Sequence, residues 1–394
     1  MKQYFSAFVG VVCFLGLPGL AFAGGTVINS AQDGDWTSVD TWVGGVVPTL
    51  IADHEAKIDH VVAVTTAGIE AKSITVGNTG PGTLNISSGD LTTGGIGMSL
   101  GGNNAGTINL SGGTFTSPSI LVGFFSAGTF NMSGGSLLTT TVTIPFDNAA
   151  ADPSSFLLSG GAVTLAGTMT IGAPTNNISG TLTIEGGAGS FEGTNVGDDG
   201  TVHFTSESTL VIRPDGPTPN DNLTRIDVGT VNIDTGATLE LDPLYTPQVG
   251  DNWFIFISQS VVGGTSAIFT NVVTPAGVTI SQIVAPTRGG GPEKMTVTVT
   301  AVPTPVTWVD FGWEMFEDGS ELNPWNTLAK GLMNVTVGGI VKIKGDKGVP
   351  FTAETPTINQ EVTLQAPSGP VTIGITARAA GQSSGSGFVS RGIQ

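Results

Sequence analysis

Five near-copies of one eight-residue segment constrain the fold of this chain more than any other feature of its sequence. The copies are GTLNISSG (82–89), GTINLSGG (106–113), GTFNMSGG (128–135), SSFLLSGG (154–161) and GTLTIEGG (180–187). Apolar and polar residues alternate in each copy, which is the pattern of a β-strand that buries one side. The residues predicted to point inward are Leu84/Ile86, Ile108/Leu110, Phe130/Met132, Phe156/Leu158 and Leu182/Ile184.

A second short strand is expected between successive copies. Its versions are SITVG (73–77), GMSLG (97–101), SILVG (119–123), TVTIP (141–145) and TMTIG (168–172). The predicted unit is therefore strand, turn, strand, turn, with a period of 22 to 26 residues. So short a unit cannot bury its own apolar side, whereas units stacked about 4.8 Å apart share one core.

The fold class that follows is all-β, a parallel β-solenoid of the right-handed β-helix kind. A β-sandwich with glycine-rich hairpins is the alternative, but the repeat is too regular and Asn-Gly hairpin signals are scarce. The 59 glycines suit tight, repeated turns. A hydrophobic content of 39% argues against a disordered glycine-rich chain.

Residues 1–23 have the features of a secretory signal peptide. Lys2 precedes an apolar run, and Ala21-Phe22-Ala23 matches the small-x-small cleavage pattern. An N-terminal membrane anchor is the alternative, against which Pro18 argues. Cys13, the only cysteine, lies inside this segment, so the mature chain is expected to have no disulfide. We therefore expect a secreted protein, extracellular or on the cell surface, and after residue 23 no apolar run is long enough to span a membrane.

The remaining sequence divides into four predicted segments, which are an N-terminal cap (24–72), the solenoid and its closing rungs (73–300), a linker (301–306) and a partial second β-helix (307–394). Trp36 and Trp42 are expected to close the apolar end of the first rung. Asn323-Pro324 predicts the start of a helix that opens the last segment, with Leu328, Leu332 and Val335 on one face.

Two stretches resemble known families. GDWTSVDTWVGGVVPT with IADHEAKID, and LELDPLYTPQVGDNWFIFISQSVVGGTSAIFTNVVTPAG, resemble segments of secreted bacterial β-helix proteins of the autotransporter-passenger type. Residues 307–372 (WVDFGWE, NPWNTLAKGL, GGIVKIKGD, VTLQAPSGPVTIG) resemble the start of a pectate-lyase-like right-handed β-helix. The resemblance implies a surface-exposed solenoid and, for the last segment, a fold used by carbohydrate-active enzymes.

A catalytic site is not expected in the solenoid. Pectate-lyase-like enzymes need a basic residue, yet there is no Lys or Arg from Ser73 to Ile212. Hydrolytic relatives would need two or three carboxylates on adjacent rungs. The acidic residues are Asp90, Asp147, Asp152, Glu185, Glu192, Asp198, Asp199 and Glu207. Asp198-Asp199, the densest pair, predicts an acidic turn, and weak Ca²⁺ binding is the alternative; otherwise we expect no cofactor.

The basic and histidine residues suggest no site either. DHEAKIDH, which contains His54 and His60, follows no strong metal-ligand spacing and predicts an edge strand or loop surface; His203 is the third histidine. Lys342, Lys344 and Lys347, with Asp346, predict a solvated strand edge rather than a lyase base. A formal charge of −18 makes nucleic acid and anionic membranes poor partners.

What remains is the outward side of the repeat. Stacking would align three rows, which are Thr83, Thr107, Thr129, Ser155 and Thr181; Asn85, Asn109, Asn131, Leu157 and Thr183; and Ser87, Ser111, Ser133, Ser159 and Glu185. One interpretation is structural, because small polar residues stack well and Asn ladders satisfy one another. Another is a repetitive surface for a repetitive partner such as polysaccharide, mineral or ice, and a third is self-association.

The leading hypothesis is a secreted or cell-surface structural or adhesive solenoid that binds extracellular polysaccharide or a cell-envelope component. Its candidate binding face is Thr83, Asn85, Ser87, Thr107, Asn109, Ser111, Thr129, Asn131 and Ser133. The alternative is a carbohydrate-active enzyme, a polysaccharide lyase or glycoside hydrolase, or a fragment of one.

Overall fold

The computed structural model describes residues 25–146, 153–174, 177–194, 199–217, 223–262, 268–286, 293–302, 304–344, 351–367 and 371–373. The predicted signal peptide and Cys13 lie outside these residues. So do four acidic residues and one lysine considered above, which are Asp147, Asp152, Asp198, Asp346 and Lys347.

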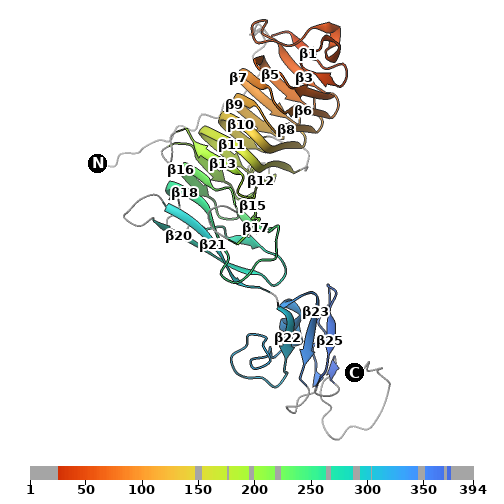
Figure 1. Ribbon diagram of the computed structural model, residues 1–394, viewed down its shortest axis with the longest axis vertical. Coiled ribbons are helices and arrows are strands. Elements are labelled where there is room, and N and C mark those ends of the chain that lie inside the picture. The colour runs from red at the N-terminus through yellow and green to blue at the C-terminus, as the bar shows by residue number, and fades with distance from the viewer. Residues whose placement is uncertain are drawn as a thin grey trace, which may run out of the picture.

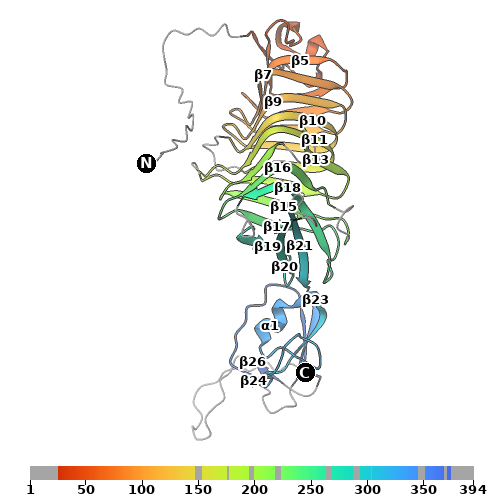
Figure 2. The same ribbon diagram turned by 90° about the vertical axis from the view of Figure 1, so that its left-hand side faces the viewer.

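Most of the chain forms a parallel β-solenoid of about 11 turns, which confirms the predicted fold class. Figures 1 and 2 show the turns stacked into a rod, with a small separate parallel sheet beyond its C-terminal end. Successive turns pair in register through parallel strands, as in β6 (Gly82–Ile86) on β8 (Gly106–Leu110). The rod is therefore a single stack in which each turn contacts its neighbours.

Each regular turn has three strand segments rather than the two predicted. The first face holds the repeated segment, in β2 (Gly34–Asp35), β4 (Val61–Val64), β6, β8, β10 (Gly128–Ile144), β11 (Ser154–Ile171), β12 (Gly180–Glu185), β15 (Ser208–Arg213), β17 (Thr238–Leu241) and β19 (Asn271–Val273). The other two faces hold β1 (Val27–Asn29), β3 (Glu55–Ile58), β5 (Ile69–Val76), β7 (Asp90–Leu100), β9 (Thr114–Val122), the remainder of β10 and β11, β13 (Gly189–Gly193), β14 (Thr201–Phe204), β16 (Ile226–Ile233) and β18 (Asn252–Val262). Register shifts inside the long strands mark where the chain bends from one face to the next.

The strand that the two-strand unit missed follows the glycines of the repeat. Leu91, Phe115, Leu137 and Val163 align in successive rungs and are buried. Each lies two residues after the last glycine of its copy, so an apolar position at constant spacing was present in the sequence. It was missed because only one or two inward residues mark this short segment.

The core is a continuous column of apolar side chains. All five predicted inward pairs have no exposed surface. Phe130 and Phe156 stack face to face, with ring centroids 4.6 Å apart and planes 1° apart. Phe115 adds a further stacked contact to Phe130, with centroids 6.4 Å apart.

Glycine is required where the chain turns between the first and second faces. Gly113 has φ of 69°, a left-handed conformation that residues with a Cβ rarely adopt. A Cβ there would also lie 1.9 Å from the carbonyl oxygen of Gly89 in the preceding rung. The close approach of stacked turns therefore explains the Gly-Gly pair.

Strand pairing already begins within residues 24–72. β1 pairs with β3 and β2 pairs with β4, and the short helices η1 (Val39–Thr41) and η2 (Val43–Gly45) lie between β2 and β3. Trp36 and Trp42 are buried in contact, with centroids 4.9 Å apart. The indole of Trp42 donates to the backbone oxygen of Trp36 at 2.7 Å. Both side chains therefore fill the N-terminal end of the core.

The prediction of an edge strand or loop surface for DHEAKIDH was wrong for its middle, β3 (Glu55–Ile58), whereas His54 and His60 lie outside the strand. β3 pairs with β1 on one side and β5 on the other. Ala56 and Ile58 point into the core, whereas Glu55 and Lys57 point outward. The charged residues alternate with only two apolar ones, so the segment looked exposed although it is an internal strand.

Antiparallel strands close the C-terminal end of the solenoid. β21 (Glu293–Ala301) pairs antiparallel with both β18 and β20 (Thr279–Pro286). Close by, the side-chain amide of Gln282 donates to the backbone oxygen of Phe269 at 3.0 Å and accepts from its N–H at 3.1 Å. The change of strand direction ends the parallel stack without another rung.

The separate sheet is parallel and contains β22 (Thr304–Val309), β23 (Val335–Ile343) and β25 (Thr363–Gln365); β24 (Phe351–Thr352) and β26 (Thr372–Ile373) pair beside it. β22 begins inside residues 301–306, the predicted linker.

The helix α1 (Leu328–Met333) starts later than predicted, with Thr327 rather than Asn323 as its cap. The reason is that Trp325 is extended beside β22, because it forms a bridge with Val309.

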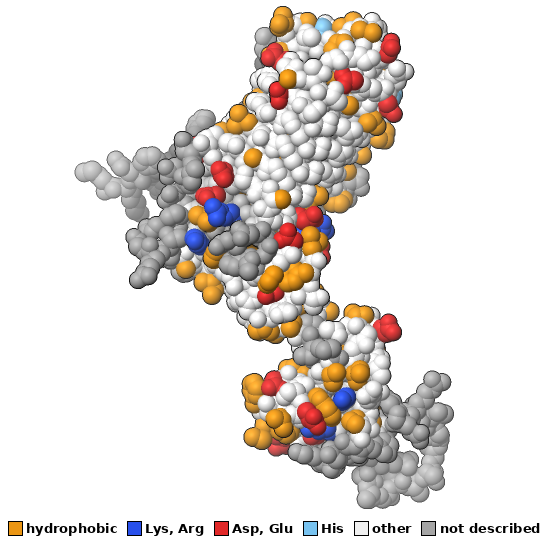
Figure 3. All heavy atoms as spheres, viewed as in Figure 1, with side chains coloured by type: hydrophobic (Ala, Val, Ile, Leu, Met, Phe, Trp, Pro, Cys, Tyr) orange, Lys and Arg blue, Asp and Glu red, His pale blue; other side chains and the backbone are white. Residues whose placement is uncertain are grey.

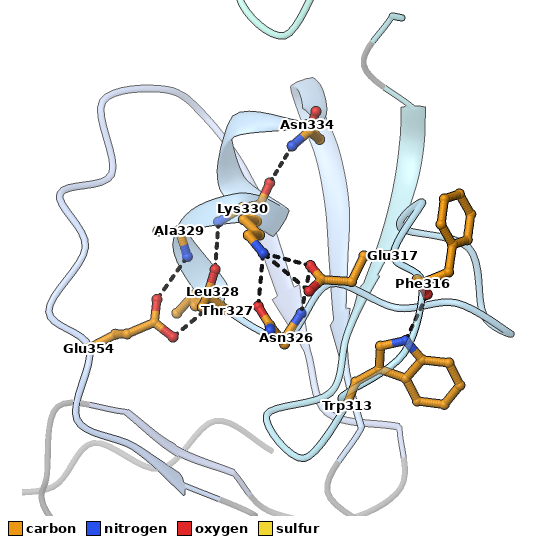
Figure 4. Close-up of polar contacts among 10 residues, drawn as sticks. All are labelled: Trp313, Phe316, Glu317, Asn326, Thr327, Leu328, Ala329, Lys330, Asn334 and Glu354. Carbon is orange, nitrogen blue, oxygen red and sulfur yellow. Dashed lines mark hydrogen bonds and ion pairs between the residues drawn. The ribbon is translucent and has the colours of Figure 1, made fainter.

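Figure 4 shows how the start of α1 is held. The hydroxyl of Thr327 accepts from the N–H of Lys330 at 3.2 Å. The carboxylate of Glu354 accepts from the N–H groups of Leu328 and Ala329 at 3.1 and 3.0 Å. A residue from a distant loop therefore completes the cap, which sequence proximity could not indicate.

One carboxylate stabilises a corner of the solenoid. Asp59 accepts hydrogen bonds from the N–H groups of Asn78, Thr79 and Gly80 and from the hydroxyl of Thr79. Burial alone would raise the pKa of Asp59. The hydrogen bonds, first that of the Thr79 hydroxyl, lower the pKa by more than burial raises it, so the pKa of Asp59 lies below its usual value. The charged form is therefore favoured in the folded state.

Replacing a ring of the phenylalanine stack should be costly. We expect Phe156→Ala to lower the free energy of unfolding by about 3–5 kcal/mol, because it leaves a cavity in the core. Leu138→Ala is the control, since Leu138 is 42% exposed, and should change it by less than about 0.5 kcal/mol. Denaturant titration followed by circular dichroism measures both, and similar effects for the two variants would contradict the packing described.

The role of Asp59 should depend on pH. A folded pKa below the unfolded value of about 3.9 gives stability that is present above that value and is lost as pH falls through the folded pKa. We expect Asp59→Asn to lower the free energy of unfolding by about 1 kcal/mol at pH 7, and its difference from the parent to shrink toward pH 2. A difference that stays constant between pH 7 and pH 2 would show that the charge has no role.

Candidate binding face

The outward threonines of the repeat form one straight row. The register places Thr83 beside Thr107, and Thr107 beside Thr129. Ser155, Thr181, Thr209 and Thr238 continue the row in β11, β12, β15 and β17. The last two were missed because their segments, STLVIRP and ATLELDP, lack the glycines of the repeat, although they keep its alternation.

The second row is a hydrogen-bonded asparagine ladder. Asn109 donates its side-chain amide to the Oδ1 of Asn85 at 2.8 Å, and Asn131 donates to the Oδ1 of Asn109 at 2.9 Å. The ladder ends at Ala63 on one side and Leu157 on the other, since these residues occupy the flanking register positions. Three half-buried amides are therefore held in fixed orientation along adjacent rungs.

The third row is shorter than predicted. Ser87, Ser111 and Ser133 are exposed where the strand segments of the face end. Ser133 pairs with Gly160 rather than Ser159, because a register shift follows Met132. Glu185 pairs instead with Arg213. The expectation of five aligned residues was therefore wrong for Ser159, and the three rows are complete only over β6, β8 and β10.

We call Thr83, Asn85, Ser87, Thr107, Asn109, Ser111, Thr129, Asn131 and Ser133 the Thr–Asn–Ser face. It contains hydroxyl and amide groups and no ionisable side chain. The first charged groups farther along it are Glu185 and, one rung later, Arg213, whose guanidinium lies 3.5 Å from Glu185 and 2.9 Å from Asp242. Figure 3 shows a wide uncharged area on one side of the solenoid, with charged side chains gathered toward its two ends.

Two carboxylates do lie on adjacent rungs away from this face. Glu192 in β13 is in register with Asp227 in β16, and both line a cavity of about 130 Å³. Burial raises the pKa of Asp227, and Arg225, 4.0 Å away, lowers it by less. The sequence pattern did not indicate Asp227, because β14 and β15 separate it from Glu192 along the chain. The cavity is much smaller than the roughly 300 Å³ at which ligand pockets begin.

The remaining acidic candidates are not gathered. Asp90 begins β7, and Asp199 accepts from the hydroxyl of Thr194. Within the part of the chain that the structure describes, no group of three or more His, Cys, Asp or Glu residues is placed to hold a metal ion. Asp199 is thus engaged in a local turn contact.

The histidines lie apart and each makes its own local contact. His54 accepts from the N–H of Thr49 at 3.2 Å, His60 bonds the hydroxyl of Ser30 at 2.8 Å, and His203 lies 3.0 Å from Asp234. These contacts hold loops and neighbouring strands together, and they bring no two histidines into one site.

Lys342 is not at a strand edge, so that prediction was wrong for this residue; Lys344 follows the end of β23, and Lys347 lies outside the described residues. Lys342 lies in β23, which pairs on both sides with β22 and β25. The ammonium groups of Lys342 and Lys344 lie 4.9 and 5.4 Å from the ring centre of Trp308. Both side chains are thus used in cation–π contacts.

A large cavity is apolar and contains no acid or base. Its volume is about 770 Å³, and it lies between the closing strands and α1, where Val278, Leu332 and Met333 contribute to its lining. No Asp, Glu, His, Lys or Arg lines it. It offers no group for proton transfer.

Comparisons of the chain with family models, with curated proteins and with solved structures found no match. The fold therefore places the chain among parallel β-solenoids and identifies no family. Among the described residues, no helix has the length and apolar character needed to cross a membrane.

The ladder should contribute to stability. We expect Asn109→Ala to lower the free energy of unfolding by about 1 kcal/mol, because it removes two side-chain hydrogen bonds and leaves two amides to water. Asn103→Ala is the control, since Asn103 is exposed in the turn before β8. It should change the free energy of unfolding by less than about 0.5 kcal/mol. Equal effects in urea titrations would show that the ladder is energetically neutral.

Proposed function

We propose that this chain is a secreted or cell-surface structural or adhesive β-solenoid that binds an extracellular polysaccharide or another cell-envelope component. The observation that carries the proposal is the Thr–Asn–Ser face, whose threonine and asparagine rows are in register over three rungs, with a serine exposed beside them on each. The solenoid fold supports a rigid rod, and the predicted signal peptide supports export.

The chemistry of the face suits a polymer of hydroxyl-rich units. Hydroxyl and amide groups both donate and accept hydrogen bonds, so they can contact sugar hydroxyls in several orientations. The rows repeat about every 4.8 Å along the rod, so neighbouring units of one polymer can make the same contact on successive rungs. Several weak contacts of this kind add up to useful affinity through multivalency.

A carbohydrate-active enzyme is the second candidate, and the pair Glu192 and Asp227 favours it. The two carboxylates lie on adjacent rungs, and Asp227 has a raised pKa, as a general acid requires. Against it stands the cavity of about 130 Å³, which is too small for a sugar ring. The adhesive function is therefore the better supported of the two.

One experiment separates these functions. Purified mature protein is incubated with cellulose, chitin, insoluble β-glucan and polygalacturonate, and the bound protein and the released reducing sugar are both measured. Retention without release supports the adhesive function, whereas release that Glu192→Gln abolishes supports the enzyme. If the protein is not retained and no sugar is released, both functions are contradicted. Sedimentation of the protein alone would then test self-association.

Placing charge on the face should abolish binding. We expect the double variant Thr107→Lys, Asn109→Lys to lose retention, because two ammonium groups interrupt the rows and need water. Thr92→Lys, Thr116→Lys is the matched control, since these two residues are also in register on adjacent rungs but point outward from another face. Circular dichroism and thermal melting check that both variants are folded. Unchanged retention in the first variant would rule out this face.

A further inference from the structure

Three phenylalanines form a cluster at the turns that lead into the Thr–Asn–Ser face. Phe124 and Phe125 lie in the turn between β9 and β10, and Phe146 follows β10. The ring of Phe124 lies 4.1 Å from that of Phe125 and 5.4 Å from that of Phe146, measured between centroids. Phe125 and Phe146 are 47% and 44% exposed. Aromatic surface is therefore grouped and accessible at one place.

The fold itself does not require phenylalanine in these turns. In the two preceding rungs, the positions of Phe124 and Phe125 are held by Asn78-Thr79 and Gly102-Asn103. Their backbones stack in the same way, since the N–H of Asn103 donates to the oxygen of Gly77 and the N–H of Phe125 donates to that of Gly101. Exposed apolar surface is unfavourable in water. Grouped exposed aromatic rings are therefore typical of an interaction site.

The cluster borders the face directly. The N–H of Gly128 donates to the hydroxyl of Ser154 at 3.2 Å, so the turn that carries Phe124 and Phe125 lies against the start of β11. Phe146 donates its N–H to the oxygen of Gly123, which places its turn beside that one. Thr129 and Ser155, the next outward residues along the two strands, are in register in the threonine row.

We propose that the cluster of Phe124, Phe125 and Phe146 binds a sugar ring of a neutral polysaccharide whose adjoining sugars lie along the Thr–Asn–Ser face; this rests on the proposed function. A sugar ring has a face of C–H groups and a rim of hydroxyls. Aromatic rings bind the first by dispersion and apolar burial, and the polar rows bind the second by hydrogen bonds. Water ice lacks the C–H face, and a mineral surface is ionic.

The charge of the protein selects a neutral ligand. No Lys or Arg occurs between Ser73 and Ile212, so the face and the cluster offer no cation to an acidic sugar. The formal charge of −18 repels an anionic polymer. No carboxylate belongs to the face, so a bridging cation has no anionic ligand there. A neutral polymer of sugars is the partner that these groups complement.

The test uses the mature full-length chain and the same four polysaccharides, with binding isotherms measured by depletion. We expect Phe125→Ala, Phe146→Ala to bind the retained neutral polysaccharide about tenfold more weakly, because each stacked ring contributes to affinity. Phe125→Trp should keep the affinity, and Phe125→Leu should reduce it, because stacking needs a flat ring. Ile96→Ala, Leu138→Ala is the control, since both residues are exposed apolar side chains on other parts of the rod.

The outcomes separate the two proposals. Unchanged affinity of the phenylalanine variant, with loss in Thr107→Lys, Asn109→Lys, overturns the role of the cluster and leaves the face. No retention of the parent on any of the four polymers overturns both. Stronger binding to polygalacturonate than to cellulose, chitin and β-glucan overturns the neutral ligand. Melting temperatures close to that of the parent exclude unfolding as the cause of a loss.

Discussion

Parallel backbone pairing between successive turns is the interaction on which the rest of this structure depends. A single turn has only a few inward side chains, and they are covered by those of the turns before and after it. Leu84, Ile108 and Phe130 occupy one column in register and have no exposed surface. Stability is therefore shared along the rod, and each end needs its own solution. Buried tryptophans provide it at the N-terminal end, and antiparallel strands at the other.

The same register that builds the core also builds the outward face. Because side chains alternate along each strand, aligning Ile108 with Leu84 places Thr107 beside Thr83 and Asn109 beside Asn85. A slip of one residue would bury the polar rows and expose the apolar column. The regularity of the face is thus a consequence of core packing, and a ligand that matches the rung spacing could use it without any dedicated pocket.

The face is uniform only where the repeat is uniform. Leu157 ends the asparagine ladder, a register shift displaces Ser159, and the ion pair of Glu185 and Arg213 introduces charge. The phenylalanine cluster lies at this same boundary, and the counterparts of the turn of Phe124 and Phe125 one and two rungs earlier carry no aromatic residue. The solenoid therefore has a neutral polar segment with an aromatic border, and its charged groups lie mostly beyond it.

The solenoid, the inward pairs, the threonine row and the asparagine row could all be predicted from the sequence. They depend on local alternation and on nearly constant spacing, and both are visible in a single chain. The third strand of each turn was missed because one buried residue, such as Phe115, gives too little alternation. The antiparallel closure, the cap that Glu354 provides to α1, the pairing of Glu192 with Asp227 and the phenylalanine cluster became visible only in three dimensions. Each depends on residues that are far apart in the sequence and are brought together by turns of unequal length. A local sequence pattern does not determine which of these residues come into contact.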